Sequence, residues 1–143
     1  MFFVSVTRLR VKSVWYLPAF FIANERSVKQ LIQTVGFARG KELIDKKLTF
    51  WTVTVWKDME AMKTFRNSEA HRKAMQKLPF WCDEASYAHW TQNSDQMPVW
   101  ATIHLKMVDE GKLTKVKQPS KQQLSKEFPA PAWTKSERIF KSA

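Results

Sequence analysis

The segment that most constrains the fold is residues 48–56, LTFWTVTVW, whose β-branched and aromatic side chains predict a strand. Both faces of this strand are apolar or aromatic: alternation places Trp56 on one face and Trp51 on the other. Such a strand is expected to be covered on both sides. Because helices in a small protein can cover only one face of a sheet, the other face needs a partner, most simply a second copy of the chain. The strand therefore predicts a homodimer.

The remaining hydrophobic periodicity predicts the order β-α-β-β-α-β, followed by a short helix. The predicted strands are 2–9, 37–46, 48–56 and 84–91, and the predicted helices are 17–34, 58–78 and 99–109. This order is that of the ferredoxin-like split βαβ arrangement, so we predict an α+β fold with one domain over residues 1–111. The chain has no internal repeat and no glycine-rich phosphate loop.

Four residues mark the predicted boundaries. Gly36 ends the first helix, as expected of a glycine beyond a helix C-terminus. Gly40 is a possible bulge in the second strand. Asn67 interrupts the second helical segment, and Pro79 is expected to end it.

The net charge of +11 is concentrated towards the end of the chain. Residues 112–143 hold 8 basic and 2 acidic side chains, which gives +6, and the remaining +5 is spread over 1–111. A basic tail can bind nucleic acid or an anionic surface. This tail lacks the interleaved aromatic and basic residues that stack on bases, so nucleic acid is disfavoured as a partner. We predict a mostly irregular tail that wraps the body or a partner subunit.

The single cysteine cannot form an internal disulfide, which suits a reducing cytoplasm, and it excludes a multi-cysteine zinc site. We predict no metal. The longest apolar run, 14–23, is about half the roughly twenty residues of a membrane-spanning helix. The N-terminus lacks the apolar core and cleavage site of a secretory signal. These features predict a cytoplasmic location without a membrane span.

Residues 50–90 carry four motifs: a strand ending in VW, a helix opening with D-x-E-A-M, then F-R-N-S-x-A-H, then W-C-D-E-A-S-x-x-H-W. Together they resemble the core signature of a bacterial family related to spheroidene monooxygenase. That family lies within the antibiotic-biosynthesis-monooxygenase-like superfamily. The resemblance implies a dimeric α/β barrel, built from two ferredoxin-like units whose sheets face each other.

The resemblance also implies several possible activities. Some members of the superfamily oxygenate aromatic polyketides without a cofactor, some degrade haem, and spheroidene monooxygenase resembles a haem-dependent enzyme. Haem-degrading members need a tryptophan and a histidine ten residues apart on the second helix. The matching positions here are Phe65 and Met75, so haem degradation by that mechanism is disfavoured. Haem binding stays possible through a shifted His71.

Three polar residues are the candidate catalytic groups: His71, His89 and Asn24. His71 lies on the apolar stripe of its helix and could act as a general base, as a haem ligand, or only as a buried histidine bonded to a backbone carbonyl. Asn24 lies on the apolar stripe of the first helix. It is either a core residue whose amide is fully hydrogen-bonded or a hydrogen-bond donor in a pocket. Periodicity does not tell whether His89 faces the helices or a dimer interface. His104 is expected at the surface.

Aromatic and apolar residues around these groups are candidates for binding a flat apolar ligand. The set comprises Trp56, Phe65, Met75, Tyr87 and Trp90. For the tryptophans as a whole, core and interface packing is the simpler interpretation.

The segment 81–84, WCDE, predicts a turn with an unreactive thiol at Cys82, because the carboxylates beside it raise its pKa. Asp83 and Glu84 could be a paired acid and base. The simpler interpretation is that one caps a turn and the other pairs with a basic residue of the preceding helix, Arg66, Arg72 or Lys73.

Three functions remain open at this point. The first is a small monooxygenase-like enzyme that acts on an apolar or aromatic compound in a pocket between helices and sheet. The second is a non-catalytic dimer that binds haem or another hydrophobic ligand. The third is a nucleic-acid-binding protein that uses the basic tail.

Overall fold

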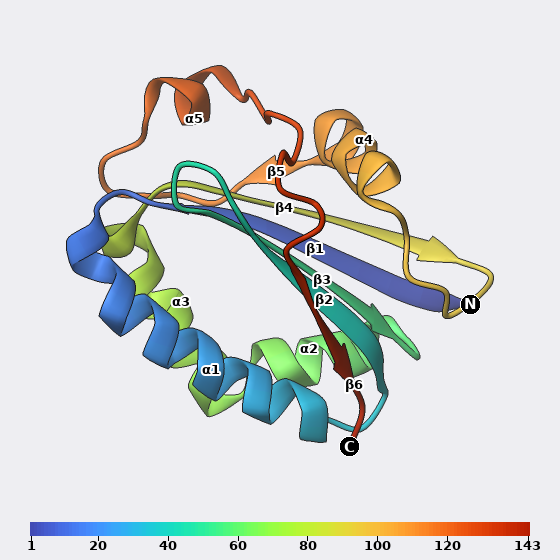
Figure 1. The fold of residues 1–143 in the computed structure, drawn as a ribbon. Coiled ribbons are helices and arrows are strands. Elements are labelled where there is room, and N and C mark those ends of the chain that lie inside the picture. The colour runs from blue at the N-terminus through green and yellow to red at the C-terminus, as the bar shows by residue number, and fades with distance from the viewer.

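The computed structural model describes residues 1–143 as one antiparallel six-stranded sheet with helices on both faces (Figure 1). The strand order is β5-β4-β1-β3-β2-β6. The strands are β1 (Phe2–Val11), β2 (Phe37–Asp45), β3 (Thr49–Trp56), β4 (Cys82–Gln92), β5 (Lys112–Leu113) and β6 (Glu137–Lys141). The helices are α1 (Leu17–Gln33), α2 (Met59–Arg66), α3 (Glu69–Trp81), α4 (Trp100–Glu110) and α5 (Lys121–Ser125), with a short 3-10 helix at Val14–Tyr16. The predicted β-α-β-β-α-β order is confirmed.

Helices α1, α2 and α3 cover one face of the sheet (Figure 1). Helix α2 begins where the Asp58 side chain accepts a hydrogen bond from the Ala61 N–H at 2.9 Å. Gly36 follows α1 with φ +92°, and a Cβ at this position would lie 2.5 Å from the Cβ of Ala61. A larger residue is therefore excluded at the junction between α1 and β2 for both conformational and steric reasons.

Two predicted boundaries are wrong. Pro79 does not end the second helical segment, because α3 continues to Trp81 with the proline inside it. So close to the helix end, the proline costs only one backbone hydrogen bond, and its carbonyl accepts one from the Lys117 N–H at 2.9 Å. The expected bulge at Gly40 lies instead between Phe37 and Arg39. Gly40 makes room for the Phe37 ring, which would lie 3.3 Å from a Cβ at this position.

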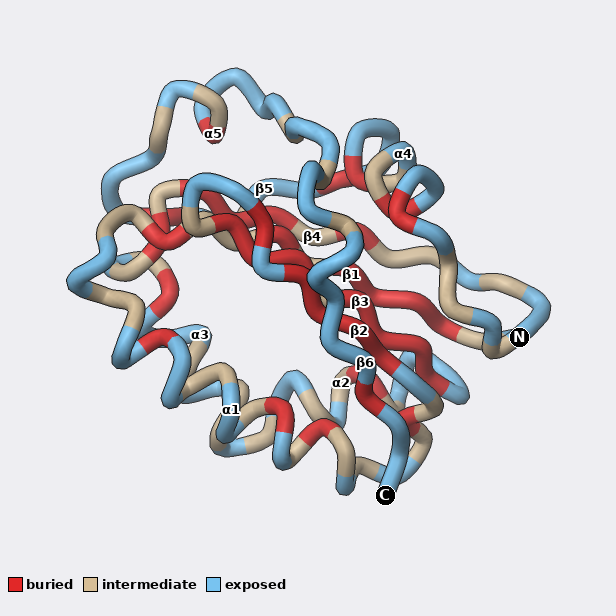
Figure 2. Tube along the Cα trace, viewed as in Figure 1, coloured by how far each residue is buried: buried red, intermediate tan, exposed pale blue.

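The second face of the sheet is covered by α4 and the C-terminal segment of the same chain. Trp51, with no exposed surface, packs there with Trp100, Ile103 and Met107 of α4, and Phe128 adds to this cluster. Figure 2 shows buried strands between the two layers. The burial of both faces of β3 is confirmed, but it does not require a second copy of the chain. The homodimer itself stays a prediction.

The C-terminal segment is held on the body by specific polar contacts. Strand β6 pairs with β2 and extends the sheet by one strand. The Asp45 carboxylate accepts hydrogen bonds from the backbone N–H groups of Ala132 and Trp133 at 3.0 Å. His104 is half-buried rather than a surface residue, because its Nε2 donates to the Phe128 carbonyl at 2.7 Å. The segment thus wraps the body, with more regular structure than its composition predicts.

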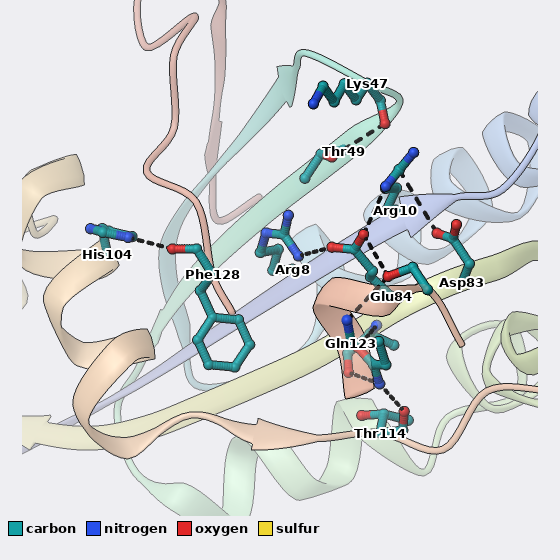
Figure 3. A network of polar contacts seen from close by, with 12 residues as sticks. Arg8, Arg10, Lys47, Thr49, Asp83, Glu84, His104, Thr114, Gln123 and Phe128 are labelled. Atoms are coloured by element: carbon teal, nitrogen blue, oxygen red, sulfur yellow. Dashed lines mark hydrogen bonds and ion pairs between the residues drawn. The ribbon is translucent and has the colours of Figure 1, made fainter. Parts of the chain in front are cut away.

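A buried carboxylate joins the C-terminal segment to the sheet (Figure 3). Glu84 accepts hydrogen bonds from Arg8 at 2.7 Å, from Arg10 at 2.8 Å and from the Ser120 hydroxyl at 2.9 Å. Burial alone raises the pKa of Glu84, but these arginine hydrogen bonds outweigh it and lower the pKa. The predicted pairing of Asp83 or Glu84 with a basic residue of the preceding helix is therefore wrong, because Arg8 and Arg10 of β1 supply the ion-pair partners of both.

None of the helices combines the length and the apolar character needed to cross a bilayer.

Helix α4 should contribute strongly to stability through its inner face. Ile103 has no exposed surface, whereas Leu105 on the same helix is 58% exposed. We expect Ile103→Ala to lower the free energy of unfolding by about 2–5 kcal/mol through the cavity that it leaves. Leu105→Ala, the matched control, should change it by less than about 0.5 kcal/mol. Urea denaturation measures both, and equal effects would contradict this packing.

Candidate functional site

A cavity of about 370 Å³ lies between the helical layer and the sheet. Helices α1, α2 and α3 line one side, and strands β1, β3 and β4 line the other. Of its 23 lining residues 12 are hydrophobic, so the cavity suits a small, largely apolar ligand. All three predicted catalytic residues line it: His71, His89 and Asn24. Their catalytic roles stay predictions.

His71, on α3, is held in one tautomer by the backbone of α2. Its Nδ1 lies 3.2 Å from the Arg66 carbonyl oxygen. Because a carbonyl only accepts hydrogen bonds, Nδ1 carries the proton, and Nε2 of the neutral ring keeps its lone pair. Burial lowers the pKa of His71; the hydrogen bond to the carbonyl opposes this and the charge of Arg66 adds to it. His71 is thus a neutral imidazole with a free acceptor nitrogen at neutral pH.

His89 faces the helices, which decides the question that periodicity left open. Its ring lies 5.1 Å from the Phe3 ring and 5.2 Å from the Tyr87 ring, measured between centroids. Burial lowers the pKa of His89, and the charges of Arg66 and Lys112 lower it further. The cavity therefore holds two histidines that are both neutral near pH 7.

Asn24 combines the two roles that the sequence left open. It lines the cavity, and its Nδ2 donates to the Glu42 carboxylate at 3.0 Å. Glu42, on β2, also accepts from the Thr52 hydroxyl at 3.3 Å and is 5% exposed. Burial raises its pKa, and the two hydrogen bonds oppose the increase. Sequence reasoning missed Glu42, although a carboxylate in the middle of a predicted strand was a signal for it.

The predicted ligand-binding residues divide into two groups. Phe65, Met75 and Tyr87 line the cavity. Trp56 does not, because it is fully buried behind Phe65 with its Nε1 donating to Thr54 at 2.8 Å. Trp90 does not line the cavity either, because it lies on the opposite face of the sheet and packs against the α4 cluster. The position of Trp90 follows from strand alternation, since its neighbour His89 faces the cavity.

The segment 81–84 is not a turn, because Trp81 ends α3 and β4 begins at Cys82. Trp81 lines the cavity, whereas Cys82 is buried in a cluster with Phe20 and Phe50. Burial, with a contribution from Asp83, raises the pKa of the Cys82 thiol to about 12. No group of three or more His, Cys, Asp or Glu side chains is arranged to hold a metal ion.

Comparison with known proteins gives the fold a family context. A family model described as antibiotic biosynthesis monooxygenase matches residues 42–77, about a quarter of the chain. This range runs from β2 through β3 and α2 into α3, and it includes both Glu42 and His71. A search of curated proteins found no match.

Solved structures extend the likeness to about two thirds of the chain. SnoaB from Streptomyces nogalater, a cofactor-independent oxygenase solved in a mutant form, matches with a TM-score of 0.56 and 17% identity, over 68% of this chain and 98% of its own. A protein from Nitrosomonas europaea described as an antibiotic biosynthesis monooxygenase matches at 0.57 and 16%, over 64% and 89%. A conserved protein from Methanosarcina mazei matches at 0.58 and 11%, over 65% and 94%.

The chain has the antibiotic biosynthesis monooxygenase fold. Identities this low establish the ferredoxin-like architecture and do not carry over an activity. The finer resemblance to spheroidene monooxygenase stays a prediction.

The two cavity histidines should titrate below the ordinary histidine pKa of about 6.5. Long-range ¹H–¹⁵N NMR on the protein should place both midpoints below 6.5 and should show His71 protonated at Nδ1 in its neutral form. Because their folded-state pKa values are lowered, these histidines make unfolding easier as the pH falls below about 6.5. A midpoint above 6.5 for either ring would contradict the site geometry.

Cys82 should be inert in the folded protein. With its pKa raised to about 12, the thiol holds almost no thiolate at pH 8, and it is also buried. We expect no reaction with Ellman's reagent at pH 8 over an hour, and one thiol per chain after unfolding in urea. Rapid labelling of the native protein would show that the segment opens.

Proposed function

We propose that this protein is a small monooxygenase that oxidises an apolar or aromatic compound in the cavity between α1–α3 and the sheet, without a bound cofactor. One observation carries the proposal: an apolar cavity contains two histidines whose lowered pKa values keep them in the basic form. The likeness to SnoaB, a cofactor-independent oxygenase, supports the same reaction class.

The residues suit an oxidation in which the substrate supplies the electrons. His71 Nε2 accepts a proton from an activated methylene, and the resulting carbanion reacts with O₂ to form a peroxide anion. The protonated His71 returns its proton to give the hydroperoxide. Loss of water, which carries the second methylene hydrogen, leaves a ketone. The sum is CH₂ + O₂ → C=O + H₂O, so no external reductant is needed.

Asn24 and Tyr87 are the proposed orienting groups. Asn24 is held by Glu42, so its amide has a fixed direction at the cavity wall. Phe65 and Met75 supply apolar contacts to a flat ring. The hydrophobic side chains of the lining limit the contact of the carbanion with water.

A second candidate function is haem binding. The free Nε2 of His71 is the group that would hold the haem iron, and haem would supply redox chemistry. The cavity of about 370 Å³ lies at the small end of ligand sites, which favours a smaller ligand. If added haemin gives a Soret band and His71→Ala abolishes it, haem binding is favoured. An unchanged haemin spectrum would rule haem binding out.

Oxygen uptake with anthrone, which has one activated methylene, tests the monooxygenase. We expect catalysed uptake, with anthraquinone as product, and a rate that rises with pH through the lowered His71 pKa, because only the neutral ring accepts a proton. His71→Gln should lower kcat by about 10²–10⁴-fold. His104→Gln, which changes a histidine on the other face of the sheet, is the control and should keep most activity.

A rate no higher than that with heat-denatured protein, for anthrone and for hydroxylated anthrones, would contradict the proposal. So would equal losses in His71→Gln and His104→Gln.

We also propose that the protein is a cytoplasmic homodimer. Since α4 and the C-terminal segment cover one sheet face, a dimer needs another surface. Light scattering after size exclusion gives the oligomeric state. Nucleic-acid binding by the tail is the third alternative; it requires salt-dependent binding that removal of residues 112–143 abolishes.

A further inference from the structure

Arg66 is the single charged side chain among the residues that line the cavity. It is the last residue of α2, five positions before His71 in the motif FRNSEAH. Four other arginines form ion pairs: Arg8, Arg10, Arg39 and Arg138. Arg66 has no carboxylate within 4.0 Å. Arg66 is exposed to solvent, as are Arg26 and Arg72, which also lack an ion pair, but of these three only Arg66 lines the cavity. The cavity lining thus includes an exposed arginine without a counter-ion.

No acidic side chain lines the cavity to balance this charge. Glu42 does not line the cavity; its carboxylate accepts hydrogen bonds from Asn24 and Thr52, which do, and burial raises its pKa. The charge of Arg66 acts on both histidines, because it lowers the pKa of His71 and of His89. Arg66 therefore sets a positive potential where a ligand would touch these rings.

We propose that Arg66 is the anion-binding residue of the cavity, and that the natural ligand has an apolar ring body with one acidic group, such as a carboxylate or an ionised phenol. An anion would supply the counter-charge that the protein does not provide, and it would form charge-assisted hydrogen bonds with the guanidinium. A planar guanidinium also suits two-pronged contact with such a group. This inference deepens the proposed function and rests on it for the choice of cavity.

The same position gives Arg66 a role in the proposed reaction. Proton transfer to His71 leaves negative charge on the ligand and positive charge on the imidazole. The charge of Arg66 favours the negative charge on the ligand and disfavours the positive charge on the imidazole. Arg66 therefore stabilises the ligand anion, and before the reaction it keeps His71 in the neutral form that accepts a proton.

The alternative role for Arg66 is structural. A cation at a helix C-terminus interacts favourably with the helix dipole, whatever the cavity binds. The two roles differ in what they predict for a ligand with and without a charge.

Two fluorescent probes separate these roles. 8-Anilinonaphthalene-1-sulfonate and N-phenyl-1-naphthylamine share one apolar body and differ by the sulfonate. We expect Arg66→Gln to weaken binding of the sulfonate probe about tenfold or more and binding of the neutral probe less than twofold. Arg66→Lys should recover part of the loss. Arg72→Gln removes the same charge from an exposed α3 residue outside the cavity, and it should change neither affinity.

A readout other than binding checks the electrostatic role. The His71 hydrogen bond uses the backbone carbonyl of residue 66, so Arg66→Gln leaves it in place. Removal of the charge should raise the NMR pKa values of both His71 and His89, and Arg72→Gln should leave them unchanged. Ala74→Trp, which fills the cavity from α3, should abolish binding of both probes and so locate them there.

Equal weakening of both probes in Arg66→Gln, or the same loss in Arg72→Gln, would overturn the proposal. Probe binding needs no turnover, so this result is distinct from a failure of the monooxygenase proposal. Suppose that Arg66→Gln selectively loses affinity for the sulfonate probe, but the wild type takes up no oxygen. The anion-binding site would then be supported, and the monooxygenase proposal would be rejected.

Discussion

The central constraint on this protein is that β3 must be buried on both faces. Trp51 and Thr52 are neighbours in the chain, yet one packs against α4 and the other lines the cavity. Burial of a large aromatic side chain is worth about 1.5–3 kcal/mol or more, so neither face can remain in water. One layer fills its face with side chains, whereas the other leaves a cavity. The close packing lies on the side of α4, and the cavity lies on the side of α1, α2 and α3.

The electrostatics of the cavity follow from the same burial. In an apolar enclosure the charged form of a histidine is disfavoured, which keeps His71 and His89 neutral. Arg66 differs from the histidines, because it is exposed to solvent and adds a guanidinium charge from the end of α2. The cavity therefore combines two bases with one permanent cation. That combination suits a ligand that is, or becomes, an anion.

Sequence periodicity found the catalytic candidates because each lies on a regular stripe. His71 and Asn24 fall on the apolar faces of their helices, and both line the cavity. It did not find Glu42, whose role depends on the pairing of β2 with β3 and on Asn24 from another element. It also did not decide whether the His89 face or the Trp90 face of β4 meets the helices, because alternation defines the two faces of a strand without orienting them.

By itself, the sequence determined the element order and the two-sided burial of residues 48–56, because both are local patterns of side-chain period. It also located the histidines within their elements. Only the tertiary structure decided what covers the second face of the sheet. The polar, basic composition of residues 112–143 does not indicate the few contacts that hold this segment on the body, such as the hydrogen bond from the Ala132 N–H to Asp45. The structure likewise decided that Arg66 meets the cavity without a carboxylate partner. The partner in an ion pair can lie far away in sequence, as Glu84 does from Arg8, so the presence or absence of such a partner is a property of the fold.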